Sequence, residues 1–517
     1  MLIENPNLEG PAERGKTHVQ ILESSALTGG SSLLTIALGV LRTKAMALFL
    51  EPAGFGLFGV YASIISVAEC LAGVGVSSSA IRQVARSAAS GDSHQISRTS
   101  TVLLRVCLLL GFLGAALLAI LSRPVSILTF GDVRHTGAVA LLSLAVFFEL
   151  LSGGQRALLQ GMRKVHDLAM SAILTACFGL LVTVPVVFFL HERGVVPAII
   201  GAGLVALLVT SHYRRRIQFE ATALTRTQQF EEASALLKLG LVFMTSFLMT
   251  TGAGYLIRIM VLRRIGYEAT GLYQAAWTLG GVYVGFILQA MGTDFYPRLA
   301  AVADDHVQCN RLVNEQTEVG LLLAGPGILA TLALAPLVLV VFYSSRFVAA
   351  VGVLRWISLG SLLQVVTWPM SYMLVAKGKH ALFWGSEVIW AIASLGFAWF
   401  GIRWSGLNGV GMAFAGSYLV YGVLLIFIVG GLSGFIWSDA NRKIGLLYFC
   451  LIALVFVTFS FLPLLPAICL GVVVALVSLV YSMRELVKLV SSDRIPGSVR
   501  RLLRSARLIP SNRERVE

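Results

Sequence analysis

The sequence contains few charged residues. Only 13% of its 517 residues are Asp, Glu, Lys or Arg, whereas 57% are hydrophobic, and the mean hydropathy is +0.83. Soluble domains typically carry about 25% charged residues, so a water-soluble fold would not cover this much apolar surface. The composition therefore excludes an ordinary soluble protein and predicts a chain that uses the bilayer as its solvent.

Motifs for catalysis, metal binding and nucleotide binding are also missing. The chain has no GxxxxGK[ST] phosphate loop, no HExxH zinc motif and no GxSxG nucleophile elbow. Its six cysteines include no CxxC pair and its eight histidines are scattered, so neither a disulfide framework nor a metal site is indicated. We therefore expect a protein that is not an enzyme and that holds no metal or cofactor, apart from a coupling ion.

Long apolar runs fill the sequence instead. About fourteen stretches reach membrane-crossing length without period-two alternation, which predicts transmembrane helices rather than a barrel. One set of alternate loops is about twice as basic as the other, and the C-terminal tail is also rich in arginine. The positive-inside rule then assigns the basic loops and both termini to the cytoplasm. It also explains most of the net charge of +14 without a nucleic-acid partner.

A weak internal repeat divides the chain. G-V-L-R at 39–42 precedes G-L-F at 56–58, and G-Y-L-I-R at 254–258 precedes G-L-Y at 271–273. Two halves of six spans each would share one orientation and be related by an axis along the membrane normal. The fold class predicted is an all-α polytopic membrane protein with two pseudo-symmetric six-helix halves and two extra C-terminal helices. Its expected parts are a cytoplasmic N-terminal segment 1–21, a six-helix half 22–212, a basic linker 213–238, a second six-helix half 239–430, helices 13 and 14 at 443–483, and a basic cytoplasmic tail 484–517.

Several apolar stretches carry a cation in their interior. A charge in hydrocarbon costs about 3 kcal/mol on insertion scales, so such residues usually face a protein interior or a water-filled path. Arginine suits a phosphate because its planar fork donates two hydrogen bonds and stays protonated. The alternatives are neutralisation of a buried acid, as for Arg156 two helical turns from Glu149, and snorkelling to the interface, as for Lys44 and Arg263. The candidates for binding an anionic substrate are Arg42, Lys44, Arg258, Arg263 and Arg355.

Acidic residues in the apolar stretches are candidates for binding a coupling H+ or Na+. They are Glu69, Glu149, Glu387 and Asp294. A structural salt bridge is the alternative for each of them. Asp294 is expected near the cytoplasmic end of its span, where it would pair with Arg298.

Helical spacing aligns polar residues along several spans. Small residues alone would serve close helix packing, but a stripe that ends in a charge favours a hydrated lumen. The stripes are Thr28, Ser32, Thr35, Gly39 and Arg42; Ser66, Glu69, Gly73 and Ser77; Glu149, Ser152, Arg156 and Gln160; and Gln274, Thr278, Gly281, Gly285, Gln289 and Gly292.

The segments around the first two spans resemble a known superfamily. The runs L-G-V-L-R at 38–42, E-P-A-G-F-G-L-F at 51–58, G-V-G at 73–75 and A-I-R at 80–82 are similar to those of multidrug/oligosaccharidyl-lipid/polysaccharide (MOP) exporters. Within that superfamily the resemblance is to bacterial polysaccharide and O-antigen flippases of the Wzx type. The plan of six, six and two spans extends it over nearly the whole chain.

This resemblance implies a function. Such a flippase would move an anionic lipid-linked oligosaccharide, usually carried on undecaprenyl pyrophosphate, to the outer leaflet by alternating access in the bacterial inner membrane. It implies a cationic lumen, matched here to Arg42, Arg258 and Arg355, and exchange against H+ or Na+. The implied partners are the lipid-linked oligosaccharide, membrane lipids, and a polysaccharide polymerase with other assembly proteins. The alternatives are a lipid II flippase of peptidoglycan synthesis and, from another class, a membrane glycan polymerase or ligase.

Overall fold

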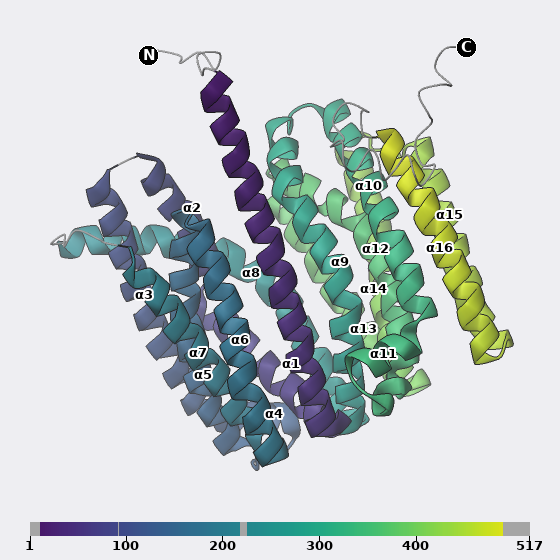
Figure 1. The fold of residues 1–517 in the computed structure, drawn as a ribbon, viewed down its shortest axis with the longest axis horizontal. Helices are drawn as coiled ribbons and strands as arrows, with labels where there is room; N and C mark the ends of the chain where they lie inside the picture. The colour runs from purple at the N-terminus through teal and green to yellow at the C-terminus, as the bar shows by residue number, and fades with distance from the viewer. Residues whose placement is uncertain (1–10, 91, 218–224, 490–517) are drawn as a thin grey trace. The chain divides into compact units, whose positions relative to one another are not determined.

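The computed structural model describes residues 11–90, 92–217 and 225–489, which are almost entirely helical (Figure 1). Residues 1–10 of the expected N-terminal segment, 218–224 of the linker and 490–517 of the basic tail lie outside the described residues. The helices are α1 (Pro11–Gly73), α2 (Val76–Ser90), α3 (Ser93–Ile120), α4 (Ser122–Phe130), α5 (Thr136–Gly161), α6 (Val165–Leu190), η1 (His191–Gly194), α7 (Val195–Arg215), α8 (Arg226–Arg264), α9 (Tyr267–Ala301), α10 (His306–Ala333), α11 (Ala335–Phe342), η2 (Ser345–Ala350), α12 (Val351–Ala376), α13 (His380–Ser405), α14 (Leu407–Ser433), α15 (Asp439–Phe461) and α16 (Leu464–Leu489).

The expected number of membrane spans agrees with these helices. Within the described ranges, eleven segments are long and apolar enough to cross a membrane, and a bent pair in α8 makes a twelfth. Two of these segments contain 45 and 51 residues, and each divides into two crossings, at the kink in α1 and at η1 between α6 and α7. Large apolar side chains such as Phe189, 76% exposed, cover the outer faces, as a lipid solvent requires.

The kink in α1 has a local cause. Glu51 adopts a left-handed φ of 57°, and Pro52 follows it as the first residue of the second half of the helix. A proline disfavours the α conformation in the residue before it, so the helix breaks at this peptide. A second break follows Gly73, where Val74 and Gly75 have positive φ, and it separates α1 from α2.

The chain forms two compact units, Met1–Arg263 and Arg264–Glu517. The first unit therefore contains α8, although the sequence repeat assigned residues 239–262 to the second half. Gly75 and Gly240 show how closely α8 packs there: a Cβ at Gly75 would lie 2.2 Å from the carbonyl oxygen of Gly240. Only glycine permits this approach of two backbones.

In the first unit α5 is the central helix. It packs against α2, α3, α4 and α7, while α6 packs against α1 and α7, and Figure 1 shows α3, α5, α6 and α7 side by side. Buried apolar side chains of several helices, including Val84, Leu103, Leu158 and Leu236, form the core next to this helix.

The second unit repeats the plan of the first. The packed pairs α3–α5, α5–α7 and α6–α7 recur as α10–α12, α12–α14 and α13–α14. A short helix also follows α3 in one unit, α4, and α10 in the other, α11. This confirms the prediction of two pseudo-symmetric halves. The two extra helices α15 and α16 pack against α10, where Tyr448 is fully buried beside Gly325.

Candidate functional site

Two cavities in the first unit are lined by charged side chains. The first, cavity 1, has a volume of about 290 Å³ and is formed by α1, α5, α6 and α7. Its polar lining residues are Thr35, Arg42, Arg156, Ser171, Thr175 and Thr210, and alanine, leucine and glycine complete the wall. The cavity therefore offers two guanidinium groups and four hydroxyl groups.

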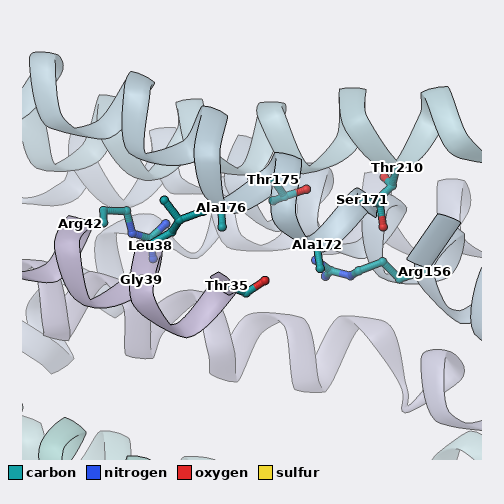
Figure 2. A pocket seen from close by; sticks show the side chains of 10 residues that line it. All are labelled: Thr35, Leu38, Gly39, Arg42, Arg156, Ser171, Ala172, Thr175, Ala176 and Thr210. Atoms are coloured by element: carbon teal, nitrogen blue, oxygen red, sulfur yellow. The ribbon is translucent and has the colours of Figure 1, made fainter. Parts of the chain in front are cut away.

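Arg42 and Arg156 occupy opposite ends of cavity 1. Figure 2 shows both side chains directed toward its middle, with Thr175 and Ser171 on the neighbouring helix between them. The stripe predicted along the first span accounts for Thr35 and Arg42, which occur at seven-residue spacing on one face of α1. The predicted stripe of Glu149, Ser152, Arg156 and Gln160 likewise accounts for the position of Arg156 on α5.

The second cavity, cavity 2, has a volume of about 290 Å³ and adjoins Arg42 from the other side. It is formed by both halves of α1 together with α5, α6 and α7. Its charged lining residues are Arg42, Glu69 and Glu149, and the remainder is mostly apolar. Arg42 is thus shared by the two cavities.

The charges of the two cavities are connected through Glu149. Its Oε2 lies 3.2 Å from Nη2 of Arg156, which confirms the pair predicted from their spacing, and Ser152 donates a longer hydrogen bond of 3.4 Å to the same oxygen. Glu149 also lines cavity 2 together with Arg42 and Glu69. Two acids and two arginines therefore form one cluster, which we call the charge cluster: Arg42, Glu69, Glu149 and Arg156.

The surroundings of Arg42 leave one of its hydrogen-bond donors unsatisfied. Its Nε is buried and finds no hydrogen-bond partner among the described residues. Gly179 of α6 lies beside the guanidinium group, since a Cβ there would be in van der Waals contact with Nη1 of Arg42 at 3.8 Å. A buried donor without a partner is costly, and an anionic ligand that enters the cavity would satisfy it.

A buried amide fixes the wall behind cavity 1. Gln155, next to Arg156 on α5, accepts hydrogen bonds from Thr210 at 2.7 Å and from Ser211 at 3.1 Å. Its own amide nitrogen lies 3.0 Å from the hydroxyl oxygen of Ser211. This network ties α7 to α5 and orients the face that carries Arg156.

The other predicted cations of the first unit lie outside both cavities. Nη1 of Arg258 donates to the carbonyl of Gly254 at 3.1 Å in its own helix. Nη2 of Arg263 donates to the carbonyl of Ile127 in the last turn of α4, where a cation interacts favourably with the helix dipole. Lys44 lies on α1 two residues beyond Arg42 and lines neither cavity. A substrate-binding role for these three residues stays a prediction.

The remaining candidates belong to the second unit. Arg355 of α12 stacks on Phe459 at 3.5 Å from the ring centroid, and its Nη2 is buried without a hydrogen-bond partner in the described part of the chain. Oε1 of Glu387 on α13 accepts a 2.6 Å hydrogen bond from Tyr421 on α14. Their roles also stay predictions.

Asp294 forms the surface pair that was expected for it. Its Oδ2 lies 3.1 Å from Nη1 of Arg298, one helical turn away, and its side chain is 75% exposed. An exposed pair of this kind contributes little to stability.

Sequence reasoning missed the hydroxyl wall of cavity 1. Ser171 and Thr175 lie one turn apart on α6, and Thr210 is on α7. The spacing of Ser171 and Thr175 in an apolar span was the available signal. It is weak, because hydroxyl groups in membrane helices often bond to the carbonyl one turn before, as Thr210 does with Ala206 at 2.7 Å.

Comparison with known sequences identifies the family. The sequence pattern of a family described as "Polysaccharide biosynthesis protein" matches residues 45–352, which is more than half of the chain. The chain belongs to this family. It is also 23% identical over 411 residues to the lipid III flippase of Escherichia coli (strain K12) and to that of Shigella flexneri, covering 78% of this chain and 96% of each relative.

Solved structures of other proteins share the fold of this chain. The lipid II flippase MurJ in an inward closed conformation superposes with a TM-score of 0.65 at 14% identity, covering 89% of this chain and 99% of that one. An inward-facing multidrug resistance MATE transporter of the MOP superfamily gives 0.60 at 15% identity, covering 78% and 94%. The predicted MOP superfamily fold is thereby confirmed, and the chain is a multi-pass membrane protein.

Proposed function

We propose that this protein is a flippase that moves a lipid-linked oligosaccharide across the membrane for polysaccharide biosynthesis. Membership of a polysaccharide biosynthesis family and similarity to lipid III flippases support the transport reaction. The observation that carries the substrate class is cavity 1, where two guanidinium groups and four hydroxyl groups face one space. Guanidinium groups bind phosphate with two parallel hydrogen bonds, and hydroxyl groups exchange hydrogen bonds with sugars.

The substrate we infer is a glycan on a prenyl pyrophosphate such as undecaprenyl pyrophosphate. Its head group cannot cross hydrocarbon unaided, because unsatisfied polar groups there cost several kcal/mol each. Rocking of the two pseudo-symmetric halves would expose the cavities to one leaflet and then the other. Lys44, Arg258, Arg263 and Arg355 remain candidates for further contacts with the anionic head group.

We further infer the setting of the reaction. The basic loops support a location in the bacterial cytoplasmic membrane with both termini in the cytoplasm, so transport would run from the cytoplasmic to the outer leaflet. A polysaccharide polymerase that uses the delivered substrate would be a partner. Among the acids proposed for H+ or Na+ coupling, Glu69 and Glu149 have better support than Asp294, because they line cavity 2 and Asp294 is exposed.

Arginine substitutions test this function. Arg42→Ala or Arg156→Ala removes charge-assisted hydrogen bonds worth about 1.5–3 kcal/mol, so we expect transport to fall roughly 10- to 150-fold. Arg42→Lys keeps the charge and should retain partial transport. Flipping of a fluorescent prenyl-pyrophosphate glycan in proteoliposomes measures the rates, and Arg193→Ala, exposed in η1 and outside both cavities, is the matched control. Unchanged transport by the Arg42→Ala, Arg156→Ala double variant would contradict the proposal.

The same proteoliposomes separate the alternative functions. A lipid II flippase would prefer a substrate that carries the peptide of peptidoglycan precursors over a peptide-free glycan. A glycan polymerase or ligase would lengthen the glycan or transfer it, whereas a flippase returns it chemically unchanged. Chromatography of the recovered lipid distinguishes these results.

A further inference from the structure

A third cavity of the first unit, cavity 3, is apolar. It has a volume of about 270 Å³ and is formed by the second half of α1 together with α3, α4 and α8. Eleven of its twelve lining residues have no polar side-chain atom, and the twelfth is Tyr255. Such a cavity does not suit water, because a buried water needs about two to four polar partners.

Cavity 3 and cavity 2 lie on opposite faces of one helix. On the second half of α1, Ser66 and Glu69 line cavity 2, whereas Ile64, Val67 and Leu71 line cavity 3. At about 100° per residue, these two sets point in roughly opposite directions. The helix therefore separates cavity 3 from a substrate head group in cavity 2, and the surrounding bilayer is the nearer source of an apolar ligand.

The wall of cavity 3 is open to the bilayer. Leu117 of α3 is 55% exposed and Leu128 of α4 is 54% exposed, so lipid chains cover this side of the protein. One end of the cavity lies where α1 and α3 touch, since a Cβ at Gly114 would lie 2.4 Å from Cβ of Ala72. From there the wall continues along α3 to Leu121, where α4 begins.

The length of cavity 3 matches one leaflet. Its lining residues on α1 lie between positions 64 and 72, which corresponds to about 12 Å at 1.5 Å per residue. The hydrocarbon of a single leaflet is about 15 Å thick. A phospholipid acyl chain fits this length, whereas the eleven-isoprene chain of an undecaprenyl carrier is much longer.

The hydroxyl group of Tyr255 is already used by the protein. Its oxygen lies 2.5 Å from Oγ1 of Thr129 on α4, and Thr129 donates its own hydrogen to the carbonyl of Val125 at 2.7 Å. A threonine hydroxyl carries one hydrogen, so Tyr255 is the donor to Thr129. No polar hydrogen then remains for a ligand inside cavity 3, which favours a hydrocarbon chain over a polar head group.

A cation lies beside this cavity. Arg263, two turns beyond Tyr255 on α8, is exposed and donates to the carbonyl of Ile127, the residue before Leu128. Its Nη2 would lie 3.8 Å from a Cβ at Gly131, and within the described ranges Arg263 forms no ion pair. A guanidinium group has five N–H donors, so several remain to bind a phosphate. Its charge favours an anionic head group.

We propose that cavity 3 binds one acyl chain of an anionic phospholipid of the bilayer, whose phosphate pairs with Arg263. The chain fills space between α1, α3, α4 and α8, where an empty cavity would cost its lining residues their dispersion contacts. Arg263 selects the lipid by charge, and the apolar wall holds the chain. The site does not depend on the transported glycan.

Photolabelling of the full-length protein in proteoliposomes tests this site. The probe is a phosphatidylglycerol with a diazirine on its acyl chain, in a phosphatidylcholine matrix, and mass spectrometry locates the labelled residues. We expect Leu117 and Leu128 to be labelled at least about threefold more than Leu113, which is 53% exposed on α3 but outside cavity 3. Replacing part of the matrix with unlabelled phosphatidylglycerol should reduce labelling in the cavity and leave Leu113 unchanged.

Substitutions separate the head-group contact from the chain contact. Arg263→Gln should reduce cavity labelling by the phosphatidylglycerol probe about fivefold, the usual effect of one interfacial cation, and leave labelling by a phosphatidylcholine probe with the same chain unchanged. Arg193→Gln, exposed in η1, is its control. Ala68→Phe places a ring in cavity 3 and should abolish the excess labelling by both probes. Ala119→Phe, half-buried on α3 and outside the three cavities, is the matched control.

Three results would overturn the proposal. They are equal labelling of Leu117 and Leu113 in wild type, unchanged labelling by the phosphatidylglycerol probe in Arg263→Gln, and displacement of the probe by undecaprenyl phosphate but not by phosphatidylglycerol. The last result would assign cavity 3 to the prenyl carrier. If Ala68→Phe yields no folded protein, the Arg263 comparison and the wild-type labelling pattern decide. The proposed function is judged separately, by transport in the Arg42 and Arg156 variants.

Discussion

Asn314 ties the start of α15 and the segment before it to α10, and its removal gives a measurable prediction. From the first turns of α10, its Nδ2 donates to the carbonyls of Asn310 at 2.9 Å and Ile436 at 3.1 Å. Its Oδ1 accepts from the backbone N–H of Ser438 at 2.8 Å and from Nδ2 of Asn441 at 2.9 Å. Two of these four bonds join α10 to the segment that connects α14 with α15, and a third joins it to the first turn of α15.

The size of the effect follows from these bonds. Each hydrogen bond contributes about 1 kcal/mol net, so Asn314→Ala loses roughly 2–4 kcal/mol of local stability. Asn441, only 5% exposed, would be left with one fewer acceptor, and burial makes that loss harder to recover from water. Since every 1.4 kcal/mol is a factor of ten, local opening of the 434–441 segment should become roughly 30- to 700-fold more frequent.

Hydrogen–deuterium exchange of the peptides that contain residues 434–441 measures this opening. We expect Asn314→Ala to exchange faster by the stated factor, and Asn314→Asp, which keeps the accepting oxygens for Ser438 and Asn441, to show a smaller change. Gln308→Ala, an exposed amide on the same helix, is the matched control and should match wild type. Exchange within threefold of wild type for Asn314→Ala, or equal effects of the two Asn314 variants, would refute the reasoning.

Two further substitutions are predicted from single contacts. Gly409→Ala adds a Cβ that would lie 1.9 Å from the carbonyl oxygen of Gly401 on the facing helix, so we expect it to lose about 1–3 kcal/mol of stability, measured as a lower melting temperature. Gly385→Ala is the control, because a Cβ at that position would have nothing within 4 Å. Equal melting temperatures of the two variants would contradict this prediction. Burial lowers the pKa of His135, whose Nδ1 lies 2.9 Å from the Tyr61 hydroxyl oxygen, so its stabilising contribution is present above its ordinary pKa of 6.5 and is lost as the pH falls through that value. His135→Gln should therefore melt with a weaker dependence on pH between 7.5 and 5, and a stronger dependence would contradict the assignment.

Predictions that depend on local spacing were confirmed. The stripe on the first span places Thr35, Gly39 and Arg42 in one cavity, and the two-turn spacing of Glu149 and Arg156 gives an ion pair. Both follow from the 3.6-residue period of a single helix, which the sequence specifies without knowledge of its neighbours.

Predictions that depend on which helices are neighbours were less complete. Ser171 and Thr210 line the same cavity as Arg42 only because α6 and α7 pack beside α1 and α5. The contact of Arg263 with the carbonyl end of α4, more than 130 residues earlier in the chain, is likewise not specified by helical period. Apolar helices of similar composition pack in many combinations with similar free energy, so periodicity alone does not select the partners.

The sequence by itself determined that the chain crosses the membrane about fourteen times, that its two halves repeat, and that arginines and glutamates lie on helix faces within the spans. Those properties come from hydropathy and helical period, which are local. The tertiary structure alone decided that Arg42 and Arg156 line one cavity and that Arg42, Glu69 and Glu149 line the other. That arrangement depends on which helices pack together, because the lining residues come from α1, α5, α6 and α7.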